Sequence, residues 1–155
     1  MRRGKTNYYL DIAEVVAERA TCLRRRYGAI IVKDDEVVAT GYNGAPRGRK
    51  NCTDINRCLR QENNIASGEK YELCRSVHAE TNACLSAGRK HCIGATLYLA
   101  GLQDDGYAKA ECCIMCKRII INAGINKVYY RVNENDYESI LVKDWIEKDE
   151  GLDML

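Results

Sequence analysis

The sequence predicts an α/β fold built in layers, with a central sheet in which some strands run parallel. Two observations carry this prediction. Apolar residues recur at helical spacing near the start of the chain, and in its second half helical segments alternate with β-branched runs. The length of 155 residues suits one compact domain, so we expect residues 1–155 to form a single domain.

The first half of the chain predicts one helix and one β-hairpin. The helix should cover residues 8–24, with Gly28 as its stop signal. The hairpin should join the apolar runs at 29–32 and 37–42. Residues 43–76 are polar and contain many turn formers, so we expect a long Cys-containing loop with one short helix. A loop of this length is usually functional or is held in place by something.

The second half predicts three helices and two strands. The helices are expected over residues 78–88, 114–123 and 137–148, and the strands over 96–100 and 127–131. Four side chains should form the packing face of the closing helix: Tyr137, Ile140, Leu141 and Trp145. This alternation of helices and strands is what makes part of the sheet parallel.

Composition and charge exclude several classes of protein. A net charge of +2 argues against a broad electrostatic grip on a nucleic acid. The chain has no run of about 18 apolar residues and no apolar segment typical of a secretory signal, so we expect no membrane span and a cytoplasmic location. In that reducing compartment, the nine cysteines indicate metal sites or buried thiols rather than disulfides.

Two short motifs carry the strongest functional signal. His78-Ala79-Glu80 and Cys113-Ile114-Met115-Cys116 each stand at the start of a predicted helix. His78, Cys113 and Cys116 can supply three ligands to one zinc ion, which leaves the fourth tetrahedral position for water, as in catalytic sites. Glu80 lies two residues after the ligand histidine, where a carboxylate can carry protons without binding the metal.

Each motif alone is open to other interpretations. His-Ala-Glu is a common chance triplet, and C-x-x-C also occurs in redox pairs and zinc fingers. Both motifs together, in this order and each at a helix start, favour a catalytic zinc site. The other histidine, His91, lies in a polar segment and is expected at the surface.

The motif pair resembles that of the zinc-dependent nucleobase deaminases, in which H-x-E is followed by P-C-x-x-C. Cys112 stands where that pattern has proline, which leaves open which two of the three neighbouring cysteines bind; the spacing favours Cys113 and Cys116. The stretch Gly41-Tyr42-Asn43-Gly44-Ala45-Pro46-Arg47-Gly48 is similar to that of deoxycytidylate deaminases in the cytidine/deoxycytidylate deaminase superfamily. The resemblance covers roughly residues 8–131 and is greatest to the shorter bacterial and phage members.

This resemblance implies a three-layer α-β-α domain with a mixed sheet and a hydrolytic reaction that converts dCMP to dUMP and ammonia. It implies that Asn43 reads the sugar 3′-hydroxyl and that the backbone of Ala79 lies against the base edge. Arg26 is the candidate for the 5′-phosphate, because a guanidinium matches a phosphate. Asn43 is also a common turn residue before glycine, and Arg26 could equally belong to a solvated helix end.

Some deoxycytidylate deaminases hold a second, structural zinc near the same loop. Four thiolates would close such a site here: Cys22, Cys52, Cys58 and Cys74. The alternative is that these thiols are scattered and bind nothing. Cys84 is expected in the core, while Cys92 and Cys112 receive no role.

Some members of the superfamily are hexamers regulated by dCTP and dTTP. The resemblance implies a homo-oligomer here, a hexamer or a dimer, and makes Arg89 a candidate contact for a dCTP or dTTP effector. Arg89 could also be part of an ordinary polar turn.

Two other functions are compatible with the same motifs. Another deaminase of the superfamily, acting on tRNA adenosine, free cytidine or a modified cytosine nucleotide, would use the same zinc ligands and glutamate. A non-enzymatic zinc-binding module would use the cysteines alone and would give Glu80 no role in turnover.

Overall fold

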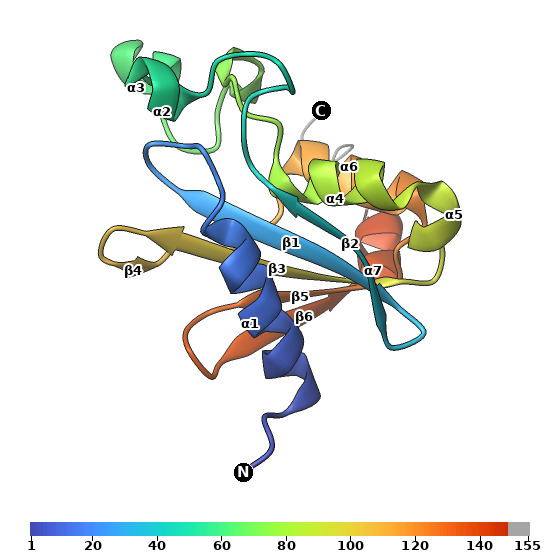
Figure 1. The fold of residues 1–155 in the computed structure, drawn as a ribbon. Helices are drawn as coiled ribbons and strands as arrows, with labels where there is room; N and C mark the ends of the chain where they lie inside the picture. Colours follow the sequence, from blue (N-terminus) through green and yellow to red (C-terminus); the bar gives the residue numbers. More distant parts are fainter. Residues whose placement is uncertain (149–155) are drawn as a thin grey trace.

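The computed structural model describes residues 1–148 of the chain (Figure 1). These residues form a six-stranded sheet in the order β2-β1-β3-β5-β6, with β4 paired to β3. The strands are β1 (Arg26–Lys33), β2 (Glu36–Tyr42), β3 (Thr96–Gln103), β4 (Gly106–Tyr107), β5 (Lys127–Arg131) and β6 (Tyr137–Leu141). The helices are α1 (Lys5–Ala17), α2 (Cys52–Ile55), α3 (Leu59–Glu62), α4 (Ala79–Ala87), α5 (Arg89–Cys92), α6 (Ile114–Ala123) and α7 (Val142–Lys148), with a 3₁₀ turn at Tyr71–Leu73.

The sheet is mixed, as predicted. Strand β3 runs parallel to β5 and antiparallel to β1, while β2 and β6 pair antiparallel at the two ends. The parallel pair arises because α6 lies between β3 and β5 in the sequence and carries the chain back across the sheet.

Helices cover both faces of the sheet, which confirms the predicted three-layer arrangement. Helix α1 packs on one face, mainly against β1 and β3, and its buried residues share a core with Ile30, Val32 and Tyr98. The opposite face carries α4 and α6 (Figure 1). Their core includes Ile31, Leu97 and many small residues.

Two glycines bring the helices close to the sheet. A Cβ at Gly28 would lie 2.0 Å from the backbone oxygen of Ala13 in α1. A Cβ at Gly41 would lie 2.3 Å from the backbone nitrogen of Ala83 in α4. Only glycine permits such backbone contacts. Gly28 was expected to stop the first helix, and it instead lies inside β1, where it lets α1 pack closely.

The first helix ends earlier than predicted. It stops at Ala17 rather than at residue 24, and the chain then turns so that the Thr21 N–H donates to the carbonyl of Asn43. This long-range hydrogen bond draws residues 18–25 toward the loop after β2. The helical spacing of apolar residues in the sequence therefore extends past Ala17, the residue at which tertiary contacts end the helix.

The closing helix was predicted too long. Residues Tyr137–Leu141 form β6, paired with β5, and only Val142–Lys148 is helical. The pairing satisfies the backbone groups at the open edge of β5, and this tertiary contact overrides the helical spacing of the apolar residues. Trp145 is buried as expected, but Tyr137 and Leu141 are exposed.

The long segment 43–76 is more structured than predicted. It contains α2, α3 and the 3₁₀ turn, and an isolated bridge between Gly44 and Val77 closes its base. Within residues 1–148, no helix is long and apolar enough to cross a bilayer.

Candidate active site

Two helix N-termini meet at the site, and each presents part of the predicted ligand set. His78 is the N-cap residue of α4, and Cys113 is the N-cap residue of α6. Nδ1 of His78 lies 3.2 Å from Sγ of Cys116 and 3.5 Å from Sγ of Cys113. Among the described residues, these three are the one group of potential metal ligands whose donor atoms all lie within 4.8 Å of one another. Cys112 is not part of it.

The two thiols of the C-x-x-C motif differ in acidity. A hydrogen bond from the Cys116 thiol is the largest cause that lowers the pKa of Cys113 to about 4, and His78 lowers it further. The Cys116 backbone N–H also donates to the Cys113 sulfur at 3.4 Å. Holding the shared proton raises the pKa of Cys116. One imidazole nitrogen and two thiol groups, one of them already acidic, match the donors that zinc prefers.

Glu80 is buried beside this cluster, in the first turn of α4, and is 5% exposed. Burial raises its pKa, because the charged form loses its hydration. Its neighbour Cys112 is also buried, and both burial and the Glu80 charge raise the pKa of the Cys112 thiol. A carboxyl group held away from bulk water next to three metal donors can accept and deliver protons to a bound ring.

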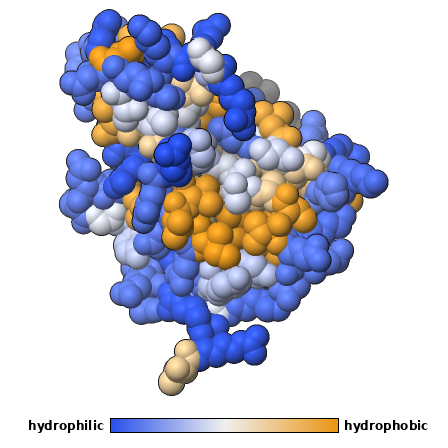
Figure 2. All heavy atoms as spheres, in the orientation of Figure 1, coloured by the Kyte–Doolittle hydropathy of each residue, from blue (hydrophilic) through white to orange (hydrophobic). Residues whose placement is uncertain are grey.

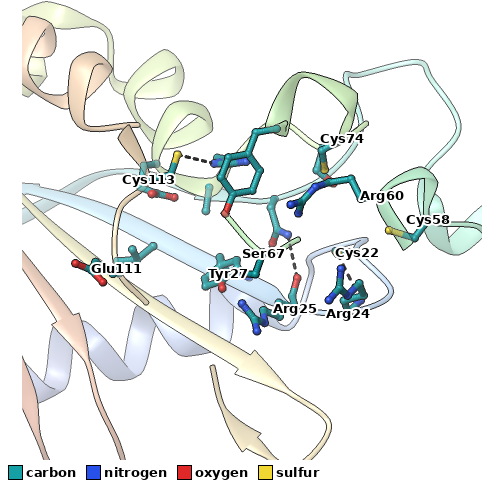
Figure 3. A pocket seen from close by; sticks show the side chains of 17 residues that line it. Cys22, Arg24, Arg25, Tyr27, Cys58, Arg60, Ser67, Cys74, Glu111 and Cys113 are labelled. Carbon is teal, nitrogen blue, oxygen red and sulfur yellow. Dashed lines mark hydrogen bonds between the residues drawn. The ribbon is translucent and has the colours of Figure 1, made fainter. Parts of the chain in front are cut away.

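A pocket opens in front of the cluster (Figure 3). His78, Ala79, Glu80 and Cys113 are among the residues that line it. The other lining residues come mainly from the segment before β1 and from the long loop, and they are Cys22, Arg24, Arg25, Tyr27, Asn43, Cys58, Arg60, Ser67, Tyr71, Cys74, Ser76, Leu99 and Glu111. The pocket is therefore rich in arginine, as a site for an anionic ligand would be.

Comparison with known proteins decides the family. Residues 3–132 match the family described as the cytidine and deoxycytidylate deaminase zinc-binding region. The chain belongs to this family.

The curated proteins similar to this chain include two deoxycytidylate deaminases. The deoxycytidylate deaminase of Mycobacterium phage D29 is 39% identical over 127 residues, which cover 79% of this chain and 91% of that protein. The deoxycytidylate deaminase of Schizosaccharomyces pombe is 35% identical over 129 residues, which cover 83% of this chain but only 37% of that protein. The chain thus spans nearly the whole phage protein and about a third of the fungal one.

A solved structure of similar fold carries nucleotides. The dCMP deaminase of the cyanophage S-TIM5, in complex with dCMP and dUMP, is 27% identical with a TM-score of 0.58. The match covers 84% of this chain and 83% of that chain. The cytidine deaminase of Burkholderia pseudomallei, at 19% identity and a TM-score of 0.54, shares the fold.

In this member of the deaminase family, Asn43 holds the backbone at the start of β1. Its Oδ1 accepts from the Tyr27 N–H at 2.7 Å, and its Nδ2 donates to the Arg25 carbonyl at 3.0 Å. Asn43 is 6% exposed and lines the pocket. One N–H and one lone pair of its amide remain for a ligand, so its role in reading the sugar stays a prediction.

The structure separates the three consecutive arginines. Arg24 and Arg25 line the pocket, whereas Arg26, the predicted phosphate contact, is the first residue of β1 and does not line it. Arg89 lies at the opposite end of α4 from His78, and its Nε donates to the Asn122 carbonyl at 3.1 Å. The roles predicted for Arg26 and Arg89 stay predictions.

The four cysteines assigned to a second metal gather in the long loop and beside it. Cys52 is buried, and Cys22, Cys58 and Cys74 are half-buried. After burial, the nearby charges of these three thiols are the next causes that raise the pKa of Cys52. Cys22 Sγ accepts from the Arg24 N–H at 3.4 Å. The other three thiols lie near Cys52, but no three of the four sulfurs lie within 4.8 Å of one another, as the donors of His78, Cys113 and Cys116 do.

The pocket residues that sequence reasoning missed include Tyr27, Arg60 and Tyr71. The ring of Tyr71 contacts the ring of His78 edge-on, with centroids 5.1 Å apart. Arg60 stacks over Tyr71, with 4.6 Å between Cζ and the ring centroid. Arg60 and Tyr71 come from the polar loop, where no motif or periodicity marks them. Two simpler expectations are confirmed, because Cys84 is buried and His91 is exposed.

Proposed function

We propose that this protein catalyses the hydrolytic deamination of dCMP to dUMP and ammonia. The observation that carries the proposal is the convergence of His78, Cys113 and Cys116 beside the buried Glu80, at a pocket that three arginines also line. Support comes from the curated relatives named as deoxycytidylate deaminases and from the similar structure in complex with dCMP and dUMP.

In this proposal, His78, Cys113 and Cys116 would hold a zinc ion, which when bound would supply Lewis-acid activation of water at neutral pH. Glu80 takes a proton from the attacking water as the water oxygen bonds to C4 of the cytosine ring, and it delivers this proton to N3. Glu80 then passes the second water proton to the amino group, the C4–N bond breaks, and ammonia leaves. The products, dUMP and ammonia, account for all atoms of dCMP and water.

Ammonia release from a substrate panel tests the proposal. The zinc-loaded protein would be assayed on dCMP, CMP, dCTP, deoxycytidine and a tRNA anticodon stem. We expect the highest kcat/KM on dCMP. A preference for the tRNA stem or for deoxycytidine would replace dCMP with one of the rival substrates, and adding 5-methyl-dCMP tests the modified nucleotides.

The proposal includes a second, structural zinc held by Cys22, Cys52, Cys58 and Cys74. Support comes from the proximity of the other three thiols to Cys52 and from the backbone N–H of Arg24, which donates to Cys22 Sγ at 3.4 Å. Binding would require the sulfurs to move closer together, and it would order the long loop.

Zinc stoichiometry tests this second site. We expect two zinc ions per chain in the wild-type protein and one in Cys58→Ser, with faster proteolysis of the loop in the variant. Cys84→Ala is the matched control, because it removes a buried thiol outside the cluster and should keep both ions. A wild-type stoichiometry of one would contradict the second site.

A homo-oligomer and regulation by dCTP and dTTP belong to the same proposal, as does a cytoplasmic location. Support for self-association comes from the face that carries α1 and β2, where Figure 2 shows an apolar area. Val15 of α1 is 64% exposed, Val37 of β2 is 41% exposed, and β2 is an edge strand. Light scattering after size-exclusion chromatography, with and without each nucleotide, measures the assembly.

A further inference from the structure

The segment between Cys58 and Cys74 forms one wall of the pocket and places an arginine deep inside it. Arg60 is 9% exposed, and Figure 3 shows its side chain extending into the pocket. Its guanidinium stacks on Tyr71, and Tyr71 in turn contacts His78. One phenol ring therefore separates the guanidinium of Arg60 from the imidazole of a zinc ligand.

The guanidinium of Arg60 is held in place by hydrogen bonds, but one of its N–H groups has no acceptor among the described residues. Both hydrogen bonds of Arg60 come from Nη2, which donates to the carbonyls of Ala66 and Glu69 at 2.8 Å each. Nε is buried and has no partner among the described residues. No carboxylate of the described residues forms an ion pair with Arg60. A buried cation with an unpaired N–H is unfavourable until an anionic acceptor binds it.

We propose that Arg60 binds the 5′-phosphate of the substrate and sets the preference for a nucleotide over a nucleoside. This inference rests on the proposed function. A pyrimidine nucleotide places its phosphate one sugar ring away from the base, which matches the spacing of one phenol ring between Arg60 and His78. The guanidinium fork fits phosphate oxygens. Arg24, by contrast, is exposed at the pocket, where water weakens its attraction for an anion.

The test compares kcat/KM for dCMP and for deoxycytidine in Arg60→Met. We expect the value for dCMP to fall about 100-fold, through KM more than through kcat, while the value for deoxycytidine stays within about twofold. Arg60→Lys keeps the charge but loses the fork and should fall between the wild type and Arg60→Met. Arg19→Met is the matched control, because it removes one positive charge from an exposed position that does not line the pocket.

The nucleoside serves as the internal measure of folding. Equal losses on dCMP and deoxycytidine would assign Arg60 a purely structural role in the loop and overturn the inference, as would unchanged activity on dCMP. If the wild type deaminates neither compound, the proposed function fails separately. Calorimetric titration with dCMP then still tests Arg60, because Arg60→Met should weaken binding of dCMP and leave binding of deoxycytidine unchanged.

Discussion

Nδ1 of His78 lies 3.2 Å from Sγ of Cys116, although 38 residues separate them in the sequence. The two residues belong to the N-terminal turns of α4 and α6, which pack on the same face of the sheet. The sheet therefore brings two sequence motifs together into one set of metal donors. The consequences of this arrangement can be measured one residue at a time.

The ligand set predicts which cysteines control the catalytic zinc. Cys113→Ser and Cys116→Ser should each lower the zinc content by one ion per chain, because each removes one of three donors. Cys112→Ser is the neighbouring control and should keep full zinc content, because its sulfur lies outside the donor set. Elemental analysis of dialysed protein gives the count. Loss of zinc in the Cys112 variant alone would reassign the ligands.

The close approach of β2 to α4 predicts a sensitive glycine. Gly41→Ala places a Cβ 2.3 Å from the nitrogen of Ala83, so α4 must move away from the sheet and take His78 with it. We expect a loss of about 3 kcal/mol in the free energy of unfolding and weaker zinc binding. Gly4→Ala has nothing within 4 Å of its new Cβ and should change neither. Urea unfolding with zinc titration compares the two variants.

The anchor of α1 predicts a pH-dependent part of the stability. A hydrogen bond from Arg3 is the largest cause that lowers the pKa of Asp11 below its ordinary value of 3.8, and the buried Arg131, 2.7 Å away, lowers it further. A lowered folded-state pKa stabilises the protein above the unfolded value, and this stability is lost as the pH falls through the folded value.

The variant Asp11→Asn measures that contribution. At pH 7 it should lower the free energy of unfolding by roughly 0.5–1 kcal/mol, since the Asp11 side chain is 45% exposed and solvent screens its charge. The difference from wild type should disappear once the pH falls below the lowered folded-state pKa of Asp11. Asp104→Asn, an exposed change without a described ion pair, should show no such trend. A difference that persists in acid would mean that Asp11 acts through packing.

The grouping of His78, Cys113 and Cys116 and the general fold were predictable because their signals are local. Each of these signals, whether a helix start, a glycine that ends a helix or the spacing of ligands, spans only a few residues. Helix α6 accordingly has the predicted bounds. The pairing of the two motifs also needed only their order along the chain. For the same reason the position of Glu80 beside this group followed from its distance to His78 in the sequence.

The remaining features depend on long-range contacts. Strand β6 exists because β5 offers it an open edge, which no local pattern reports. In an extended chain, neighbouring side chains point to opposite sides, so a shift of one residue distinguishes Arg25, in the pocket, from Arg26. Arg60 and Tyr71 enter the site through a loop whose path is set by tertiary contacts.

The proposed proton transfer by Glu80 during deamination of dCMP can be tested with one substitution, Glu80→Gln. The amide keeps the shape of the buried side chain but cannot shuttle a proton. Ammonia release from dCMP by the zinc-loaded variant should fall by about 10³–10⁴-fold, with zinc content and thermal unfolding close to wild type. A folded, zinc-loaded Glu80→Gln protein that turns over dCMP at the wild-type rate would contradict the account.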